Sequence, residues 1–353
     1  MTIREFKQNF KYAFRPHKPK LFFRLAWALI KSKIFRKPPL RYVDFAIDFD
    51  CNLRCSHCFA TALKKPGKKQ MAPKDYERVA DECMKLGTVN FSFQGGEPLM
   101  FKNLPEILKA CKPDRNVISL TTNGTLLNIE RIKQLKTLGV DILTISLDSS
   151  IPKEHDAFRG MEGAFEKTIS GIKIALKEGL NVTLGTVVTH QTLRSEGING
   201  IIKLALELEL NLNLILPVPI GRWHNNLDIA LTKEDLDYID ELTKKYVPYV
   251  RTDFQANLGE YGCGAAKEIL YLTPYGDVLV CPFIHISFGN VFEDSIETIR
   301  KRALQNPYLS YYHQQCLAST DKEFIEKYLG KTYNSDELPL KADKVFDNLK
   351  VIK

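Results

Sequence analysis

The chain has 353 residues, 44% of them hydrophobic, which is enough to bury a sizeable core and to form one large domain plus a smaller one. It contains no run of 18 or more apolar residues, and its first residues lack the apolar core and small-residue cleavage site of a secretory signal, so we expect a cytoplasmic protein. The formal net charge is +8, yet residues 1–42 hold twelve Lys or Arg against Glu5 alone and therefore carry +11. The basic charge belongs to an N-terminal extension.

Within the extension, residues 20–37 have the pattern of an amphipathic helix. Its apolar face carries Phe23, Trp27, Ile30 and Ile34, and its cations are Arg24, Lys31, Lys33, Arg36 and Lys37. This pattern fits peripheral contact with an anionic membrane surface. The favoured alternative is a helix that caps the main domain with its cations in solvent, because core-facing helices outnumber interfacial ones among soluble chains. No basic motif interleaved with aromatic residues occurs, so we expect no nucleic-acid partner.

From Tyr42 onward, apolar and β-branched runs alternate with helical segments such as residues 73–86, 129–138 and 164–177. The strand candidates are residues 42–49, 90–94, 117–123, 141–148, 181–189 and 211–219. Six βα units predict an α/β fold with a parallel sheet and right-handed crossovers, in which ligands bind at the carboxyl ends of the strands.

Chemically informative residues follow four of these predicted strands. Cys51 comes after the first strand, the sequence GGEP (residues 95–98) after the second, TNG (residues 122–124) after the third, and Ser146 with Asp148 closes the fourth. Because the carboxyl ends of parallel strands meet at one edge of the sheet, we expect these residues to share one site.

The sequence CNLRCSHC places Cys51, Cys55 and Cys58 in a C-x3-C-x2-C spacing. Three thiolates can hold three irons of a [4Fe-4S] cluster and leave the fourth iron free to bind a substrate or cofactor. The alternative is a structural zinc site with His57 as the fourth ligand. The isolated Cys83 and Cys111 lie on apolar-periodic helical segments and are expected to be buried hydrophobes.

The ordered set CNLRCSHC, QGGEP, TNG and ISLD, each at a strand end, resembles the radical S-adenosylmethionine superfamily over roughly residues 44–220. This resemblance implies a partial (β/α)6 parallel barrel. It also implies that the free iron chelates the amino and carboxylate groups of S-adenosylmethionine. An electron from a flavodoxin- or ferredoxin-type donor then produces a 5'-deoxyadenosyl radical, which abstracts a hydrogen atom.

The resemblance also assigns cofactor-binding residues. Glu97 and the backbone around Gly95 and Gly96 would accept hydrogen bonds from the cofactor ammonium, while Ser146 and Arg159 would donate to its carboxylate. The alternatives are a tight turn for the glycines and a surface cation for Arg159.

By the same resemblance, His57 and Val188 would flank the adenosine, although Val188 fits an ordinary core position equally well. Asp148, His155 and Asp156 are titratable and lie near the predicted mouth of the barrel. Nothing in the sequence separates a catalytic acid or base from a structural one, so we assign no catalytic residue.

After an amphipathic helix at residues 231–250, Cys263, Gly276 and Cys281 form a C-x12-G-x4-C pattern around the turn TPYGD. This hairpin resembles the twitch auxiliary-cluster domain more than the longer SPASM domain, because only Cys316 follows it. The three thiols would hold a second [4Fe-4S] cluster, with substrate or a protein ligand on its fourth iron. The candidate protein ligands are His285, His313 and Ser319. The alternatives are a zinc-ribbon remnant and core cysteines.

These observations predict a basic extension (residues 1–42), a radical S-adenosylmethionine core with its bridging helix (residues 43–248) and a small hairpin-plus-helix auxiliary-cluster domain (residues 249–353). We expect an enzyme of oxidoreductase or lyase type. It would abstract hydrogen from a small hydroxylated, carbohydrate-like molecule and oxidise, epimerise, eliminate from or rearrange it.

Two features favour this substrate class: the extension is short for a peptide-recognition module, and Pro282 follows Cys281, where sulfatase-maturing relatives carry an aspartate base. The main alternative is a radical peptide- or protein-modifying maturase. A further alternative is a non-catalytic scaffold that binds an Fe-S cluster and S-adenosylmethionine.

Overall fold

The computed structural model describes residues 18–34, 39–257, 260–333 and 335–346. Its centre is one sheet with the strand order β11-β10-β9-β8-β1-β2-β3-β4-β5-β6-β7. The strands are β1 (Tyr42–Ala46), β2 (Asn90–Gln94), β3 (Val117–Thr122), β4 (Ile142–Ser146), β5 (Asn181–Val187), β6 (Asn211–Ile215), β7 (Val250–Arg251), β8 (Ile269–Leu272), β9 (Asp277–Leu279), β10 (Ile286–Asn290) and β11 (Leu340–Lys341).

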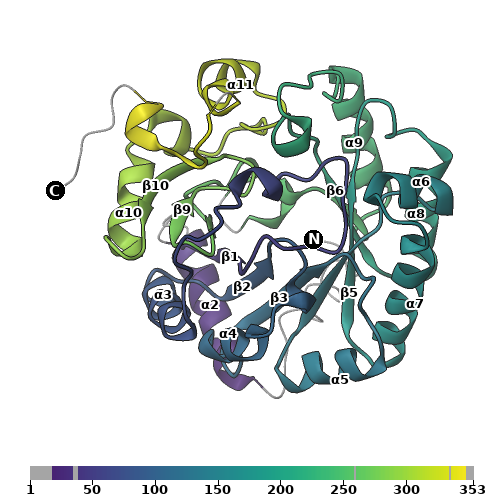
Figure 1. Cartoon of the computed structure of the whole chain (residues 1–353), viewed down its shortest axis with the longest axis horizontal. Helices are drawn as coiled ribbons and strands as arrows, with labels where there is room; N and C mark the ends of the chain where they lie inside the picture. The colour runs from purple at the N-terminus through teal and green to yellow at the C-terminus, as the bar shows by residue number, and fades with distance from the viewer. Residues whose placement is uncertain (1–17, 35–38, 258–259, 334, 347–353) are drawn as a thin grey trace.

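Strands β1 to β7 are parallel, and they curl with their helices on the outside (Figure 1). Because β7 pairs only with β6, the sheet does not close, and the predicted partial (β/α)6 barrel is confirmed with β7 as an additional parallel strand. The helices are α2 (Pro19–Lys33), α3 (Pro73–Lys85), α4 (Leu104–Ala110), α5 (Ile129–Thr137), α6 (Pro152–Arg159), α7 (Ala164–Lys177), α8 (Glu196–Glu207), α9 (Lys233–Lys245), α10 (Ile296–Leu304) and α11 (Lys322–Lys327).

Short 3-10 turns follow several strands and carry residues of the site. They are η1 (Ala60–Leu63), η2 (Pro98–Met100), η3 (Gly221–Trp223), η4 (Asp253–Ala256), η5 (Pro307–Leu309), η6 (Leu329–Thr332) and η7 (Ala342–Lys344). None of the helices in the described ranges is long and apolar enough to cross a membrane.

The two faces of the barrel strands differ in polarity. Val43 and Phe45 of β1 pack into the main apolar core with residues of the outer helices, as do the alternate residues of neighbouring strands. The residues between them face the barrel lumen. There Asp44 stands beside Ser92 of β2, and Ser92 stands beside Ser119 of β3. A polar lumen is expected where a barrel encloses ligands rather than a second apolar core.

The hairpin predicted around the turn TPYGD is present as β8 and β9, with Gly276 at φ 84° in the turn. Strand β8 also pairs in parallel with β1, so the C-terminal strands continue the sheet of the barrel (Figure 1). Cys83 and Cys111 are fully buried in the main core, which confirms the prediction for these two thiols.

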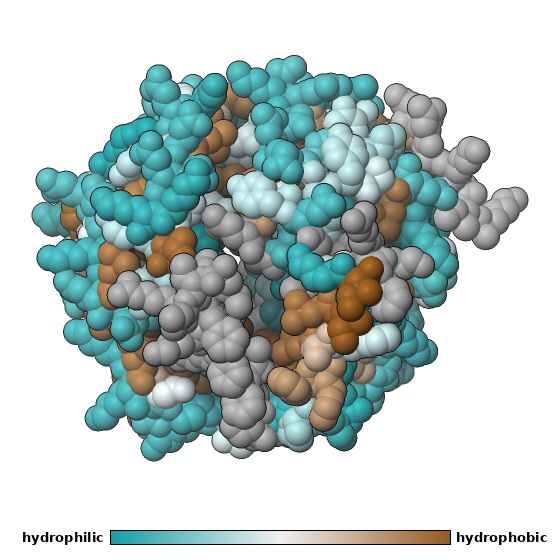
Figure 2. Space-filling view, turned by 180° about the vertical axis from the view of Figure 1, so that it is seen from behind, coloured by the Kyte–Doolittle hydropathy of each residue, from teal (hydrophilic) through white to brown (hydrophobic). Residues whose placement is uncertain are grey.

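Helix α2 packs beneath the amino ends of the strands, which confirms that it caps the main domain. Lys18, before its first turn, is buried and pairs with Asp141, and Arg24 donates to the backbone carbonyls of Thr88 and Arg115. The opposite side of α2 exposes large apolar residues, which Figure 2 shows gathered on the back of the molecule: Phe22, Phe23, Trp27, Leu29, Ile30 and Ile34. Of the cations predicted for this segment, Arg36 and Lys37 lie outside the described residues.

Candidate active site

The first thiol loop follows β1 and is held against the C-terminal end of α6. The N–H groups of Arg54 and Ser56 donate to the carbonyls of Arg159 (3.1 Å) and Phe158 (2.9 Å). A side chain at Gly160 would come within 2.7 Å of the Arg54 carbonyl oxygen, so this contact requires glycine. The loop therefore has a fixed place at the mouth of the barrel.

The three thiols of this loop are free and close enough to influence one another. Burial raises the pKa of Cys51 to about 11; the N–H of Leu53 opposes this, and the charges of Glu97, Cys55 and Cys58 add to it. Burial also raises the pKa of Cys55, against the effect of Arg159. Without a metal these two thiols stay protonated at neutral pH, whereas bound iron would ionise them.

The glycines after β2 allow that loop to approach the residues before Cys51. A side chain at Gly95 would meet the Asp48 carbonyl oxygen at 2.0 Å, and one at Gly96 would meet that of Asp50 at 1.9 Å. The N–H groups of Gly96 and Glu97 donate to the same two carbonyls, both at 2.8 Å. Both glycines thus serve the close packing of two loops, which is compatible with a backbone role toward a cofactor.

Glu97 connects the loops that follow β2 and β3. Its buried carboxylate accepts hydrogen bonds from the Thr122 hydroxyl (2.7 Å), the Asn123 N–H (2.8 Å) and the Leu99 N–H (3.1 Å). A carboxylate offers about four acceptor positions, so about one is left for a ligand donor. The sequence predicted Glu97 as an acceptor for the cofactor, but it gave no sign of these three protein donors.

Arg159 lies beneath the thiol loop and is only 6% exposed, so it is not a surface cation. Its Nη2 and Nε lie 2.6 and 2.7 Å from Oδ2 of Asp148, and Nη1 lies 3.7 Å from Sγ of Cys55. Nδ1 of His155 accepts from the Asp148 N–H, and burial lowers the pKa of this imidazole to about 4. Asp148 therefore orients a cation that contacts a thiol of the loop.

His57 is stacked rather than turned toward the thiols. Its ring lies 4.6 Å from that of Phe158 and 5.8 Å from that of Trp223, and burial lowers its pKa to about 3. Among the residues that the structure describes, no group of three or more His, Cys, Asp or Glu is placed so that it could hold a metal ion.

The other predicted residues lie on separate elements of the barrel. Ser146 ends β4 beside Gly185, half-buried, and Val188 is fully buried just after β5. Asp156 accepts from the N–H groups of Gly163 (2.6 Å) and Phe165 (2.7 Å) and thereby holds the start of α7. Both oxygens of the Asp156 carboxylate therefore have a structural role.

The second thiol set, Cys263, Cys281 and Cys316, comes together from three segments. The Cys263 N–H donates to the His313 carbonyl at 2.7 Å, three residues before Cys316. Burial raises the pKa of Cys316 to about 12, and Cys263 adds to the effect. Burial also raises the pKa of Cys281 well above its usual range, with further contributions from Cys263 and Cys316. Each of these thiols therefore lies within electrostatic reach of another.

Buried polar atoms without partners gather around the two thiol sets. In the described part of the chain they include Nδ1 of His57, the hydroxyl of Tyr271, Nε2 of His285, Nε2 of His313 and Oγ of Ser319. Leaving such an atom unpaired costs about 1–3 kcal/mol, and a concentration of them marks a place where bound groups complete the structure. Together with the free thiols, they supply the ligand chemistry of two iron-sulfur clusters and a polar cofactor, although the described thiols are not drawn together around a metal ion in this structure.

Tyr271 was not predicted. It is Asp44's neighbour across β1 and β8, and its pKa is raised well above the usual range by burial and then by the charges of Asp44, Cys58 and Cys281. Its hydroxyl, which has no partner among the described residues, thus lies within electrostatic reach of one thiol of each set. No local sequence signal marks it, because its position depends on the pairing of two strands more than 200 residues apart in the chain.

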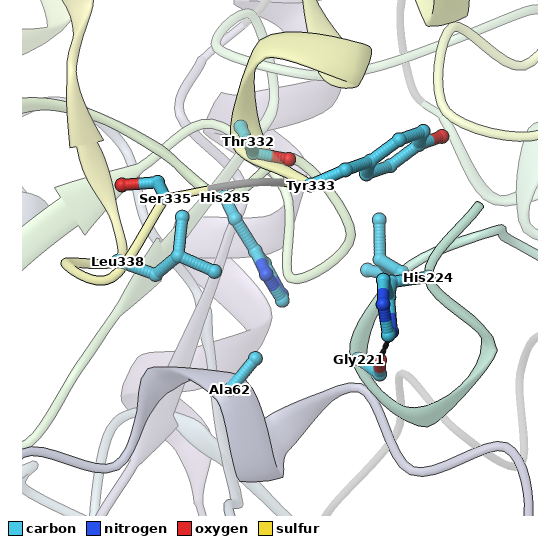
Figure 3. Close-up of a pocket in the computed structure, with 9 residues that line it drawn as sticks. Ala62, Gly221, His224, His285, Thr332, Tyr333, Ser335 and Leu338 are labelled. Atoms are coloured by element: carbon cyan, nitrogen blue, oxygen red, sulfur yellow. Dashed lines mark hydrogen bonds between the residues drawn. The ribbon is translucent and has the colours of Figure 1, made fainter.

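Beside the two thiol loops, η1, η3 and the segment around η6 enclose a cavity of about 190 Å³ (Figure 3). His285 projects into it from one side, with Ala62, Leu338 and His224 around the ring. His285 was one of the predicted candidates for the fourth ligand of the second cluster. Its side chain faces this cavity, and no cysteine is among the residues that line it.

Two family models match the chain: the radical SAM superfamily over residues 49–202, and the SPASM iron-sulfur cluster-binding domain over residues 263–320. The chain is 32% identical over 290 residues to an AdoMet-dependent heme synthase of Methanosarcina barkeri (strain Fusaro / DSM 804), covering 74% of this chain and 82% of that protein.

It is 28% identical over 271 residues to the antilisterial bacteriocin subtilosin biosynthesis protein AlbA of Bacillus subtilis (strain 168), covering 73% of this chain and 59% of that protein. Some other curated relatives are matched over only 36 to 43% of their own length.

Among solved structures, Streptococcus suis SuiB bound to the precursor peptide SuiA shares the fold, with a TM-score of 0.62 and 17% identity over 84% of this chain and 74% of that one. The family models and the heme synthase agree with the thiol loops, the strand-end residues and the open parallel barrel. This chain therefore belongs to the radical SAM superfamily and is a radical SAM enzyme with a SPASM-type iron-sulfur domain.

Proposed function

We propose that this enzyme uses S-adenosylmethionine to modify a peptide or protein by hydrogen abstraction. The observation that carries the proposal is that Tyr271, which pairs with the lumen residue Asp44, lies within electrostatic reach of one thiol from each of the two free thiol sets. When bound at Cys51, Cys55 and Cys58, a [4Fe-4S] cluster supplies the electron that cleaves S-adenosylmethionine to a 5'-deoxyadenosyl radical. A second cluster at Cys263, Cys281 and Cys316 belongs to the same proposal.

The chain's own residues would fix the geometry of this site. Arg159, held by Asp148, keeps positive charge beside Cys55 and is the nearest donor for a cofactor carboxylate. Glu97 uses three protein donors to lock the loops after β2 and β3 and keeps an acceptor position for an ammonium group. Ser146, Val188 and the stacked His57 complete the proposed cofactor wall.

Two relatives support a peptide substrate. AlbA is a bacteriocin biosynthesis protein, and SuiB was solved with a precursor peptide. The carbohydrate-like substrate favoured by the sequence analysis finds no support among the relatives, so we adopt the alternative. The missing aspartate after Cys281 does not argue against it, because Asp44 offers a buried carboxyl in the lumen, and burial raises its pKa to about 6.

A second candidate is modification of an iron-containing tetrapyrrole. It is favoured by the heme synthase match, which covers 82% of that relative at 32% identity. Both candidates share the radical chemistry and differ only in what occupies the lumen.

One experiment separates them. The full-length protein is reconstituted anaerobically with iron and sulfide, reduced, and given S-adenosylmethionine with either peptides encoded by short reading frames beside the gene or Fe-coproporphyrin III. Mass spectrometry should show a mass change in a peptide, together with 5'-deoxyadenosine. Conversion of the tetrapyrrole alone would establish the second candidate, and no 5'-deoxyadenosine under any condition would refute both.

Two partner assignments belong to the same proposal. We propose a flavodoxin- or ferredoxin-type protein as the electron donor. We also propose that residues 20–37 make peripheral contact with anionic membranes, because large apolar side chains of α2 are exposed beside its cations.

A further inference from the structure

The cavity in Figure 3 lies directly behind the first thiol loop. Its lining residues are Ala62, Ile220, Gly221, His224, His285, Thr332, Tyr333, Ser335 and Leu338. A side chain at Gly221 would come within 2.3 Å of the Cys58 carbonyl oxygen, and the N–H of Arg222 donates to that oxygen at 3.0 Å. A ligand in this cavity would therefore be separated from the thiol loop only by the loop's own backbone.

His285 contributes the most deeply buried polar side chain of the cavity. The residue is 1% exposed and lies four positions after Cys281, and its ring lies 6.3 Å from that of Phe59, which follows Cys58. The imidazole hydrogen-bonds to the backbone of Pro282, while Nε2 has no partner among the residues that the structure describes. Nδ1 therefore makes the bond to Pro282.

The protonation of this ring follows from its surroundings. Burial lowers the pKa of His285 to about 3, so the imidazole is neutral at physiological pH. A neutral ring that donates from Nδ1 carries a lone pair on Nε2. The cavity thus presents Nε2 of His285 as a buried hydrogen-bond acceptor for which the described residues provide no donor.

The side chains that line the cavity limit which ligands it can bind. None of its nine lining residues is Asp, Glu, Lys or Arg. A bare ammonium or carboxylate would lose its hydration here without gaining a counter-ion, at a cost of several kcal/mol. His224, at the exposed rim, forms a hydrogen bond between Nδ1 and the Gly221 carbonyl at 3.2 Å and adds a second ring. A neutral group with an N–H donor satisfies these constraints.

We propose that this cavity binds an uncharged amide group of the substrate, with Nε2 of His285 accepting the amide N–H. The inference rests on the proposed peptide-modifying function, since a peptide offers such a group at every residue. Binding there would anchor the segment beside both thiol loops and direct its neighbouring residue into the lumen. His285 is then a residue that positions the substrate and determines its specificity.

The test compares two isosteric probes on the full-length, cluster-loaded protein. N-methylacetamide carries the N–H, and methyl acetate has an oxygen in its place. Saturation-transfer NMR titrations should show the amide binding about five-fold or more tightly than the ester, the value of one buried hydrogen bond. His285→Phe, which keeps a ring but removes the lone pair, should abolish this preference. The control His190→Phe replaces a surface histidine bound to Asp235 and should retain it.

A second variant keeps the test interpretable if His285→Phe does not fold. Ala62→Leu fills the cavity from the opposite wall and should weaken both probes equally, while circular dichroism and iron content stay at wild-type values. Equal binding of amide and ester, or an unchanged preference in His285→Phe, would overturn the proposal. An absorption change of Fe-coproporphyrin III that depends on His285 would also overturn it, by making Nε2 an iron ligand.

These outcomes are independent of the proposed function itself. The binding titrations require no turnover, so they report on the cavity separately from the cleavage of S-adenosylmethionine. If the wild-type protein cleaves S-adenosylmethionine but does not prefer the amide probe, only the inference about this cavity is wrong. Absence of cleavage in the wild-type protein would instead refute the proposed function.

Discussion

The Asp148→Asn substitution tests the electrostatic support of the first thiol loop. It keeps the shape of the side chain but removes the charge that lies 2.6 and 2.7 Å from the Arg159 guanidinium. Both partners are at least nine-tenths buried, so the arginine would be left as an uncompensated buried cation. Breaking such a pair costs about 3–5 kcal/mol of unfolding free energy.

The assay is urea unfolding of the cluster-free protein under reducing conditions, followed by circular dichroism. Asp240→Asn is the matched control, because Asp240 pairs with Lys244 on the exposed face of α9 and the two side chains are 54% and 74% accessible. The control should unfold like the wild type, whereas Asp148→Asn should unfold at clearly lower urea. If both variants behaved alike, the proposed role of Asp148 in holding Arg159 beneath Cys55 would be wrong.

Three other variants follow from the same structure. Tyr271→Phe should stabilise the cluster-free protein by about 1 kcal/mol in urea unfolding, because it removes a buried hydroxyl without a partner; a loss of stability would reveal a partner. Burial raises the pKa of Asp44 to about 6, above its value in the unfolded chain, so its stabilising effect is complete at low pH and is lost as the pH rises from about 4 to 6. Asp44→Asn should therefore gain stability relative to wild type across this interval, and a pH-independent difference would contradict the assignment. In flotation with anionic vesicles at low salt, the protein should rise with the lipid, and Phe23→Ser with Ile34→Ser should reduce this; wild-type protein that stays with the soluble fraction would leave α2 only its capping role.

Local patterns predicted the barrel well, for physical reasons. Each of the strands β1 to β6 alternates core and lumen residues over five or more positions, which is long enough to be detected, and the cysteine spacing is set within one loop. Strand β7 has two residues and β8 has four, so neither carries a periodic signal, and their places depend on pairing with β6 and β1. The continuation of the sheet from barrel to hairpin could not be predicted for this reason.

The site was predicted in its residue types but less well in its connections. Glu97, Arg159 and His57 were identified by resemblance, yet their contacts join segments that are distant in sequence: Glu97 to Thr122, Arg159 to Cys55, and His57 to Trp223. The substrate preference failed because two local features, a short extension and Pro282, say little about what a lumen formed by seven strands accepts. Likewise, His285 was noted only as a cluster ligand, since its spacing from Cys281 gives no direction for its ring.

The measurement that tests the central claim most directly is made on the triple variant in which Cys51, Cys55 and Cys58 are all changed to alanine. After anaerobic reconstitution, the wild-type protein should hold about eight irons per chain, and this variant about four, the content of one remaining [4Fe-4S] cluster. Mössbauer spectroscopy should identify that cluster, and no 5'-deoxyadenosine should form on reduction with S-adenosylmethionine. A variant that still cleaves S-adenosylmethionine, or that holds as much iron as the wild type, would contradict the assignment of the two thiol sets.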